Sequence, residues 1–302
     1  MKTSIETNNI KLLSILLSTV LFTFHSFALS ETNIRLISNE KLARSEFAKN
    51  VGIDQNSLLW PLDRCPALFS GQTKDIQRSN IELTIICNAF KRAGFAGNIQ
   101  IVPSGNAKRQ KIELAKGNGD LLGHSIFKQS LSNKVQPLAS SFYLSDPVIK
   151  QGQFILGIFT SANQLETVSQ AFRDKTQQTL IATTLSSWKI DIKTLQNMNV
   201  KSLHLLPRYD LIAPNLGHKR ANFTLAPLDT NSPKKRPLKR VDGYKVALAD
   251  ERIFIVNKSK EKLYLALQDY INYLRQNDDL LTKAYQHANF ITDKYQSWTL
   301  IN

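Results

Sequence analysis

Along the chain, apolar residues recur at two spacings, one typical of helices and one typical of strands. The clearest helical stretch keeps Ile81, Ile85, Cys87 and Phe90 on one stripe, with Gly94 placed to end it. The stretches predicted as helices are Asn80–Phe95, Ala107–Lys116, Gln164–Lys175, Asp191–Met198, Glu261–Gln276 and Asp279–Ala288. The stretches predicted as strands are Asn33–Ile37, Asn98–Pro103, Asp120–Phe127, Gln153–Thr160, Leu180–Thr184, Val200–Leu206, Tyr244–Ala249 and Arg252–Val256. This alternation predicts a layered α/β protein with parallel strands.

The first 28 residues follow a different pattern. Lys2 and Lys11 flank a polar start, and the apolar run Leu12–Phe24 follows. Ser26 and Ala28 then place small residues three positions and one position before a cut. These features predict a secretory signal that is cleaved after Ala28. An uncleaved anchor is the alternative, but the run is shorter than the ~20 residues needed to span a bilayer. We expect a soluble periplasmic protein without a lipid anchor, since no cysteine lies at the cut.

Composition narrows the class of protein further. With 42% hydrophobic and 21% charged residues, the chain is typical of a globular protein of one large domain or two lobes. Its net charge of +15 favours anionic partners, although solubility charge spread over the surface is the alternative. The run Lys234–Arg240, in the predicted loop Asn231–Arg240, is either solvated or a docking patch for acidic headgroups or nucleic acid. We expect no nucleic-acid partner.

The cysteine count and the absence of catalytic motifs bear on chemistry. Cys65 and Cys87 both lie in the exported part, which predicts a disulfide; two unpaired buried thiols are the alternative. The cysteines and the five histidines lack zinc-ligand spacing, so we expect no metal and no cofactor. The sequence contains no Gly-x-Ser-x-Gly elbow, phosphate-binding glycine loop or His-Glu-x-x-His. We therefore do not expect an enzyme.

Four stretches carry a resemblance to a known family. Ala89–Gly94 (AFKRAG) ends a helix before a strand, and Arg109–Asp120 is an arginine-started helix that closes on a Gly-x-x-Asp stretch. In Ser141–Thr160, the segment SDPV precedes an apolar strand, and Gly243–Ala288 holds a returning strand and closing helices. In order and spacing these stretches resemble the family 3 extracellular solute-binding proteins.

The resemblance implies an α/β fold with the two-lobed periplasmic binding protein-like type II architecture. In that fold the first lobe is discontinuous and two hinge strands join the lobes. For this chain it implies a first lobe over residues 29–152 and 245–302, the latter with the C-terminal helices, and a second lobe over residues 153–244. The solute would lie in the cleft between the lobes.

The sequence also departs from the amino-acid-binding members of that family. Those members use an arginine, shortly before the Ser-x-Pro segment, for the α-carboxylate of the ligand; here Lys128 and Lys134 stand in that region. They also keep a late acidic residue for the α-ammonium group, and the context of Asp229 does not match it. These departures argue against an amino acid as the solute.

Candidate ligand-binding residues follow the predicted strand ends, which face the ligand crevice in α/β sheets. Arg109 begins a helix just beyond Ser104 and Asn106, and a helix N-terminus favours an anion. Alternatively, Asn106 only caps that helix and Arg109 is a surface charge.

Five further candidates lie elsewhere along the chain. Ser125 and Ser141 could orient a solute, or could serve the loop backbone. Trp60 and Arg64 could form an aromatic and cationic platform, with core packing as the alternative for Trp60. Trp188 follows a second-lobe strand and could stack on a ligand or cover a helix end.

The leading hypothesis is a periplasmic solute-binding protein that closes on a small polar or anionic solute. It would act as a monomer and would serve an ABC-type permease or a sensor in the membrane. The alternative is a non-catalytic accessory protein of the same fold that binds a macromolecule or membrane through its basic surface. A third hypothesis is catalysis in the cleft.

Overall fold

The structure is a computed structural model that describes residues 33–69, 77–131, 138–228 and 238–301. The predicted signal at residues 1–28, and residues 234–237 of the basic run, lie outside these ranges. Among the residues described, no helix is long and apolar enough to cross a membrane. The described chain forms two lobes, each with its own sheets and its own apolar core.

The first lobe is built on a six-stranded sheet with the order β2-β3-β1-β4-β13-β6. β1 runs parallel to both β3 and β4, whereas β2 and β13 pair antiparallel with their neighbours. The bounds are β1 Ile34–Ser38, β2 Leu59–Pro61, β3 Asn98–Pro103, β4 Leu121–Leu122, β6 Phe142–Leu144 and β13 Ile255–Asn257. Beside this sheet, β5 (Ile126–Phe127) pairs antiparallel with β12 (Arg252–Ile253).

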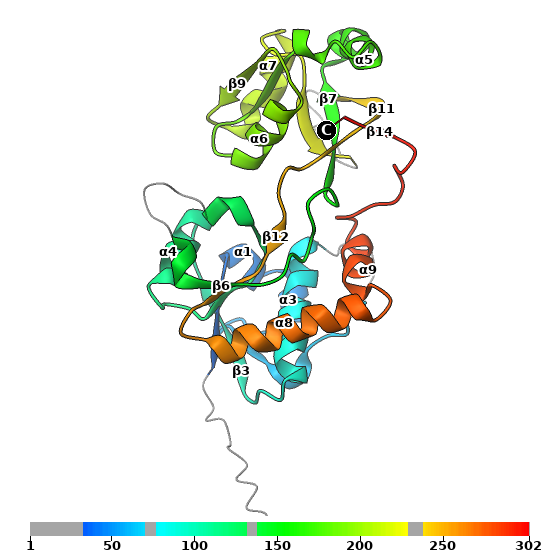
Figure 1. Cartoon of the computed structure of the whole chain (residues 1–302). Coiled ribbons are helices and arrows are strands. Elements are labelled where there is room, and N and C mark those ends of the chain that lie inside the picture. The colour runs from blue at the N-terminus through cyan, green and yellow to red at the C-terminus, as the bar shows by residue number, and fades with distance from the viewer. Residues whose placement is uncertain (1–32, 70–76, 132–137, 229–237, 302) are drawn as a thin grey trace, which may run out of the picture. The chain divides into compact units, whose positions relative to one another are not determined.

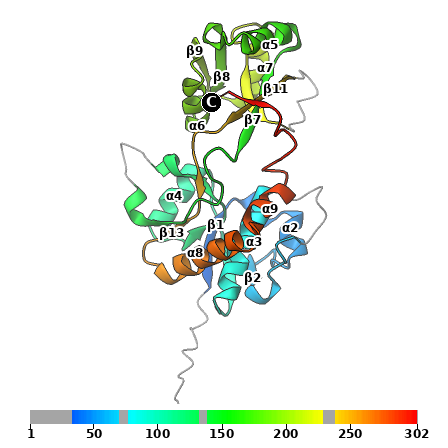
Figure 2. The same ribbon diagram turned by 45° about the vertical axis from the view of Figure 1, so that its right-hand side comes forward.

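Helices cover both faces of the first sheet because side chains alternate along its strands. Leu36 and Ile101 face the larger core with α3, α8 and α9, while Ile37 faces a smaller core with Leu114 of α4. Figures 1 and 2 both show α3 and α8 lying against one another. The helices of this lobe are α1 Glu40–Ala43, α2 Glu46–Asn50, α3 Arg78–Arg92, α4 Ala107–Ala115, α8 Glu261–Gln276 and α9 Leu280–His287.

The second lobe contains a four-stranded sheet, β10-β7-β11-β14, and a parallel pair, β8-β9. The apolar stretch predicted as a strand from Gln153 becomes β7, which pairs antiparallel with β10 and β11 and sends Leu156 and Ile158 into the core. The strand bounds are β7 Ile155–Thr160, β8 Ile181–Leu185, β9 Ser202–Leu206, β10 Thr224–Pro227, β11 Lys239–Ala247 and β14 Thr299–Leu300. The helices are α5 Leu165–Arg173, α6 Lys189–Asn197 and α7 Ile212–Gly217.

Three segments join the lobes. Residues 145–154 lead from β6 to β7, and residues 248–251 lead from β11 back to β12. The third is the C-terminal segment after α9, whose last strand, β14, pairs in parallel with β11. Arg240 secures it, because Nη1 donates to Tyr295 Oη at 2.9 Å and the guanidinium lies 4.8 Å from the ring centre of Trp298. This return to the second lobe is not predicted from the sequence.

Two local findings bear on the sequence predictions. The stretch predicted as one strand, Asp120–Phe127, divides at Gly123 into β4 and β5. A Cβ at Gly123 would overlap the Leu36 side chain, so the close approach of β1 requires glycine there. The predicted disulfide between Cys65 and Cys87 is confirmed, and it ties the segment after β2 to α3.

Candidate functional site

One cavity among the described residues, which we call the main cavity, has a volume of about 760 Å³, within the range typical of small-molecule sites. Side chains from both lobes line it. Its cationic side chains are Arg78, Lys111, Lys189 and Arg252. Its aromatic side chains are Phe127, Phe154, Trp188, Tyr209 and Phe290. The cavity therefore combines positive charge with flat apolar surfaces.

Two arginines from distant parts of the chain converge on Ser125. Arg78 opens α3, and its Nη1 lies 3.4 Å from the Ser125 carbonyl oxygen. Arg252 opens β12, and it donates through Nη2 to the same carbonyl and through Nε to Ser125 Oγ at 2.9 Å. Because both guanidinium groups share one carbonyl oxygen, two positive charges lie close together at the cavity wall.

The buried carboxylate of Glu82 lies beside the two arginines. Glu82 is fully buried on α3, one turn after Arg78, whose Nη1 donates to its two oxygens at 3.2 and 3.3 Å. It also accepts from the Ser125 amide at 3.1 Å, from Ser125 Oγ, and from Tyr285 Oη at 3.4 Å. Glu82 is thus the carboxylate in direct contact with this cluster. The charge of buried Asp250 also acts on Arg252, although its oxygens accept from the amides of Gln129 and Glu251.

The buried charges shift the titration of their neighbours. Burial, with the nearby positive charge of Arg78, lowers the pKa of Arg252 to about 10. Burial also lowers the pKa of His124, next to Ser125 in the chain, to about 4. Burial and the negative charge of Glu82 raise the pKa of Tyr285 well above its ordinary value, so Tyr285 stays a hydrogen-bond donor. At neutral pH the cluster contains two cations, one anion, and neutral His124 and Tyr285.

Aromatic rings hold both guanidinium groups in place. The guanidinium of Arg252 lies 4.5 Å from the ring centre of Phe127, its cross-strand partner on β5. That of Arg78 lies 5.2 Å from the ring centre of Phe290, which stacks at 4.2 Å on Phe154. Phe290 belongs to the C-terminal segment, so that segment helps to build the cavity as well as to join the lobes.

The N-terminus of α6 forms part of the second-lobe wall. Ser187, Trp188 and the first residues of α6 line the cavity there. Trp188 and Tyr209 are 37% and 52% exposed, with ring centres 5.9 Å apart. Asp191 lies in the first turn of α6, and burial raises the pKa of its carboxyl to about 6. This wall supplies exposed rings and the positive end of a helix.

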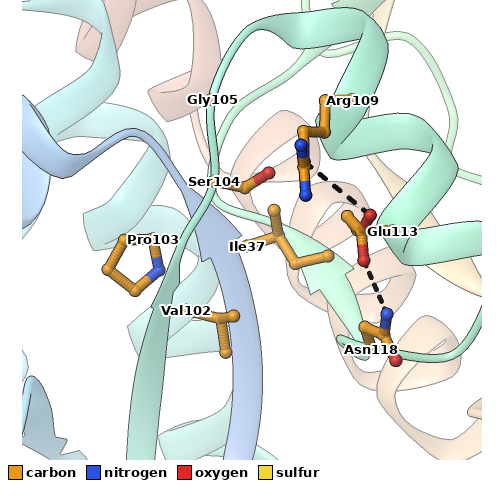
Figure 3. A pocket seen from close by; sticks show the side chains of 8 residues that line it. All are labelled: Ile37, Val102, Pro103, Ser104, Gly105, Arg109, Glu113 and Asn118. Atoms are coloured by element: carbon orange, nitrogen blue, oxygen red, sulfur yellow. Dashed lines mark hydrogen bonds and ion pairs between the residues drawn. The ribbon is translucent and has the colours of Figure 1, made fainter.

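A second, smaller cavity of about 350 Å³ lies between α4 and the ends of β1 and β3 (Figure 3). It brings together Ser104 and Arg109, as the sequence analysis expected. However, Arg109 pairs with Glu113 at 3.9 Å, and Asn118 Nδ2 donates to Glu113 at 2.6 Å. Asn106 lines neither cavity: its side chain caps α4 by accepting from the amides of Lys108 and Arg109 at 3.1 Å. The local charges are balanced here, so we favour the larger cavity.

The other expected site residues are dispersed. Ser125 anchors the two arginines, and Trp188 lines the main cavity. Ser141 and Arg64 line neither cavity; the Ser141 carbonyl accepts from the Lys258 amide at 3.0 Å.

The expectation of a ligand platform at Trp60 requires correction. Its side chain is fully buried in the core of the first lobe, beside Ile99, its partner on β3. A ring enclosed in this way offers no face to a solute.

The residues that dominate the cavity were not singled out from the sequence, although signals existed. Glu82 interrupts the apolar stripe of α3, and Arg78 precedes it by four residues, the spacing of a helical ion pair. Arg252 opens an apolar strand and is itself buried. A charged residue within an apolar run indicates a buried partner, which the sequence alone does not identify.

Comparisons with known proteins bear on the fold. No family model and no curated protein matches the chain. The solved structure of the probable amino-acid ABC transporter extracellular-binding protein of Bacillus subtilis has 13% identity and a TM-score of 0.52, covering 87% of this chain and 99% of that one. The unliganded L-cystine solute receptor of Neisseria gonorrhoeae has 13% identity and a TM-score of 0.46, covering 87% and 94% of the two chains.

The similarity to the Bacillus structure, at this identity, is evidence about the fold. The chain has the two-lobed fold of the type II periplasmic binding proteins, with the discontinuous first lobe expected from the sequence. The fold class predicted from the family 3 resemblance is therefore confirmed.

Proposed function

We propose that the protein is a solute-binding protein that holds a small anionic solute in the 760 Å³ cavity. The observation that carries the proposal is the pair of arginines, Arg78 and Arg252, which both contact Ser125 beside the buried carboxylate of Glu82. Two positive charges close together at a cavity wall are costly unless water or an anion neutralises them. A bound anion would take that position.

The free hydrogen-bonding groups point to the same kind of ligand. Every hydrogen bond from the Arg78 side chain to the described residues comes from Nη1, so Nε and Nη2 remain for a ligand. The Arg252 side chain uses Nε and Nη2 on Ser125, which leaves Nη1. On the second lobe, the first turn of α6 has amides without helical partners. A carboxylate could therefore receive donors from both lobes.

This arrangement supports capture by a shift of population. A solute that contacts both lobes favours the conformations in which both walls are close to it. We further propose export of the chain by its N-terminal signal. For the lobes we propose boundaries close to the expected 29–152, 153–244 and 245–302, with β11 continuing the second lobe to Ala247 and β14 returning to it. A permease or a sensor in the membrane would then receive the loaded protein.

A thermal-shift and calorimetric screen of organic anions tests the proposal. A solute at 100 times its Kd adds about 2.7 kcal/mol to the free energy of unfolding, which for a chain of this size raises Tm by roughly 5 °C. In Arg252→Gln the ligand-induced shift should disappear. The matched control, Arg208→Gln, removes an exposed arginine paired with Asp210 and should keep the full shift. If no organic anion raises Tm in the unmodified protein, the proposal is wrong.

A further inference from the structure

The walls of the main cavity restrict the class of solute beyond its charge. Resting on the proposed function, we infer that the solute is an aromatic carboxylic acid whose recognition needs no α-ammonium group. Three features of the cavity carry this inference: the arginine pair, the exposed rings, and the positions of the acidic side chains.

Arg78 and Arg252 form the part of the cavity that would bind the carboxylate of the solute. The guanidinium groups lie 5.2 Å and 4.5 Å from the ring centres of Phe290 and Phe127, and both contact Ser125, so the rings and the serine restrict their positions. The unused nitrogens, Nε and Nη2 of one arginine and Nη1 of the other, make no hydrogen bond to the described residues. A planar carboxylate matches such fixed planar donors better than a point charge does.

Exposed aromatic rings of the cavity would contact the other end of the solute. Aromatic residues make up 9% of the chain, whereas five of the 19 residues that line this cavity are aromatic. Phe127 and Phe290 each already carry a guanidinium on one face. Trp188 and Tyr209 are among the few large apolar side chains that are exposed in the described residues. A flat apolar solute would cover them, whereas a short aliphatic acid would leave them in water.

The acidic side chains around the cavity are poorly placed for an ammonium group. Glu82 lies beneath the arginines, where four different donor groups already occupy its oxygens. Asp191 stands in the first turn of α6, and burial raises the pKa of its carboxyl to about 6, so its surroundings disfavour the charged form that would bind an ammonium group. Lys189 opens the same turn, and Lys111 lines the opposite wall. An α-ammonium group would meet cations here.

A matched ligand series separates these features, with calorimetry on the purified exported chain. The series is 3-phenylpropionate, propionate, L-phenylalanine and 2-phenylethylamine. We expect 3-phenylpropionate to bind about 30-fold more tightly than propionate, because its ring buries apolar surface against Trp188 and Tyr209. L-phenylalanine should bind at least about tenfold more weakly than 3-phenylpropionate, and the amine should not bind.

Two exposed aromatic positions provide a variant and its control. Tyr209→Leu should weaken 3-phenylpropionate about fivefold and leave propionate unchanged, because only the ring loses a partner. Phe69→Leu, which removes a ring that is 41% exposed outside the cavity, should change neither. Both side chains are at the surface, so the fold should survive either change.

The outcomes distinguish this inference from the function on which it rests. If L-phenylalanine binds more tightly than 3-phenylpropionate, the inference is overturned and the site is one for amino acids. If propionate equals 3-phenylpropionate, or another anion binds and no aromatic acid does, the inference fails while the anion site stands. If no organic anion binds at all, both fail.

Discussion

Glu82 is the residue whose replacement tests the charge arrangement most directly. Glu82→Gln keeps the shape of the side chain but removes the negative charge that is paired with Arg78 and that also acts on Arg252. It also turns one acceptor into a donor that faces N–H and O–H groups of Arg78, Ser125 and Tyr285. The substitution therefore removes the counter-charge that contacts Arg78, and it leaves at least one buried hydrogen-bond donor without an acceptor.

The expected loss of stability follows from the burial of the pair. Removing one partner of a buried ion pair costs about 3–5 kcal/mol. Arg78 keeps 25% of its side chain exposed while Glu82 has none, so water can solvate part of the orphaned charge. We therefore expect the lower end of that range, about 3 kcal/mol, against a total stability of about 5–15 kcal/mol for a typical protein.

Urea unfolding of Glu82→Gln and of a matched control measures this loss. The control, Glu113→Gln, removes a carboxylate whose partner Arg109 lies 3.9 Å away and is 71% exposed, so it should cost less than about 1 kcal/mol. Equal m-values would show that the unfolded states are comparable. A loss below about 1 kcal/mol for Glu82→Gln would refute the view that this carboxylate compensates buried charge.

The same substitution should affect ligand binding in the opposite direction. Without the charge of Glu82, the two guanidinium groups lose the counter-charge that lies against Arg78, and a bound anion interacts with them more strongly. The variant should therefore be less stable when empty, yet show a larger ligand-induced rise in Tm than the unmodified protein. A smaller rise would indicate that Glu82 orients the arginines more than it competes with the solute.

Three further predictions concern stability. Cys87→Ala, or added reductant, should remove about 3 kcal/mol by opening a loop of sequence separation 22, and an unchanged Tm under reduction would contradict this. Burial raises the pKa of Asp191 to about 6, so the folded protein binds the extra proton and this residue makes stability fall as pH rises from about 4 to 6. Burial lowers the pKa of His124 to about 4, so this residue makes stability fall as pH drops from about 6.5 to 4. Each effect amounts to at most about 3 kcal/mol. Urea unfolding at several pH values should show stability that rises with pH in Asp191→Asn, where His124 remains, and falls with pH in His124→Gln, where Asp191 remains. Equal pH dependence of stability in the two variants would exclude the assignment.

The regular elements of the fold could be predicted from the sequence because periodicity is a local property. Asn98–Pro103 and Glu261–Gln276 have the predicted bounds, since each is an apolar pattern of the right period between clear end signals. β14 could not be predicted, because its two residues are exposed and are held only by β11, more than fifty residues earlier in the chain. The break at Gly123 likewise depends on Leu36, a distant neighbour.

The site was less predictable for the same reason. Arg78, Ser125 and Arg252 meet although more than 120 residues separate Ser125 from Arg252. Arg109 lies at a helix N-terminus after a strand end, and this local context predicted a ligand-binding role. In the structure Arg109 pairs with Glu113 instead. From the sequence, Trp60 was as well suited to packing in the core as to contacting a ligand. Only the pairing of β2 with β3, which buries its ring, decides between the two.

The C-terminal segment also has a mechanical consequence. Two crossing segments leave a pair of lobes free to turn about the axis that they define. A third tether, fixed by β14, by Arg240 and by the Phe154–Phe290 stack, limits the angle of that rotation and narrows the range of unliganded conformations. Less orientational entropy is then lost on capture of a solute. Cleavage of the chain between Phe290 and β14 would remove the constraint from β14 and should widen the range of unliganded conformations.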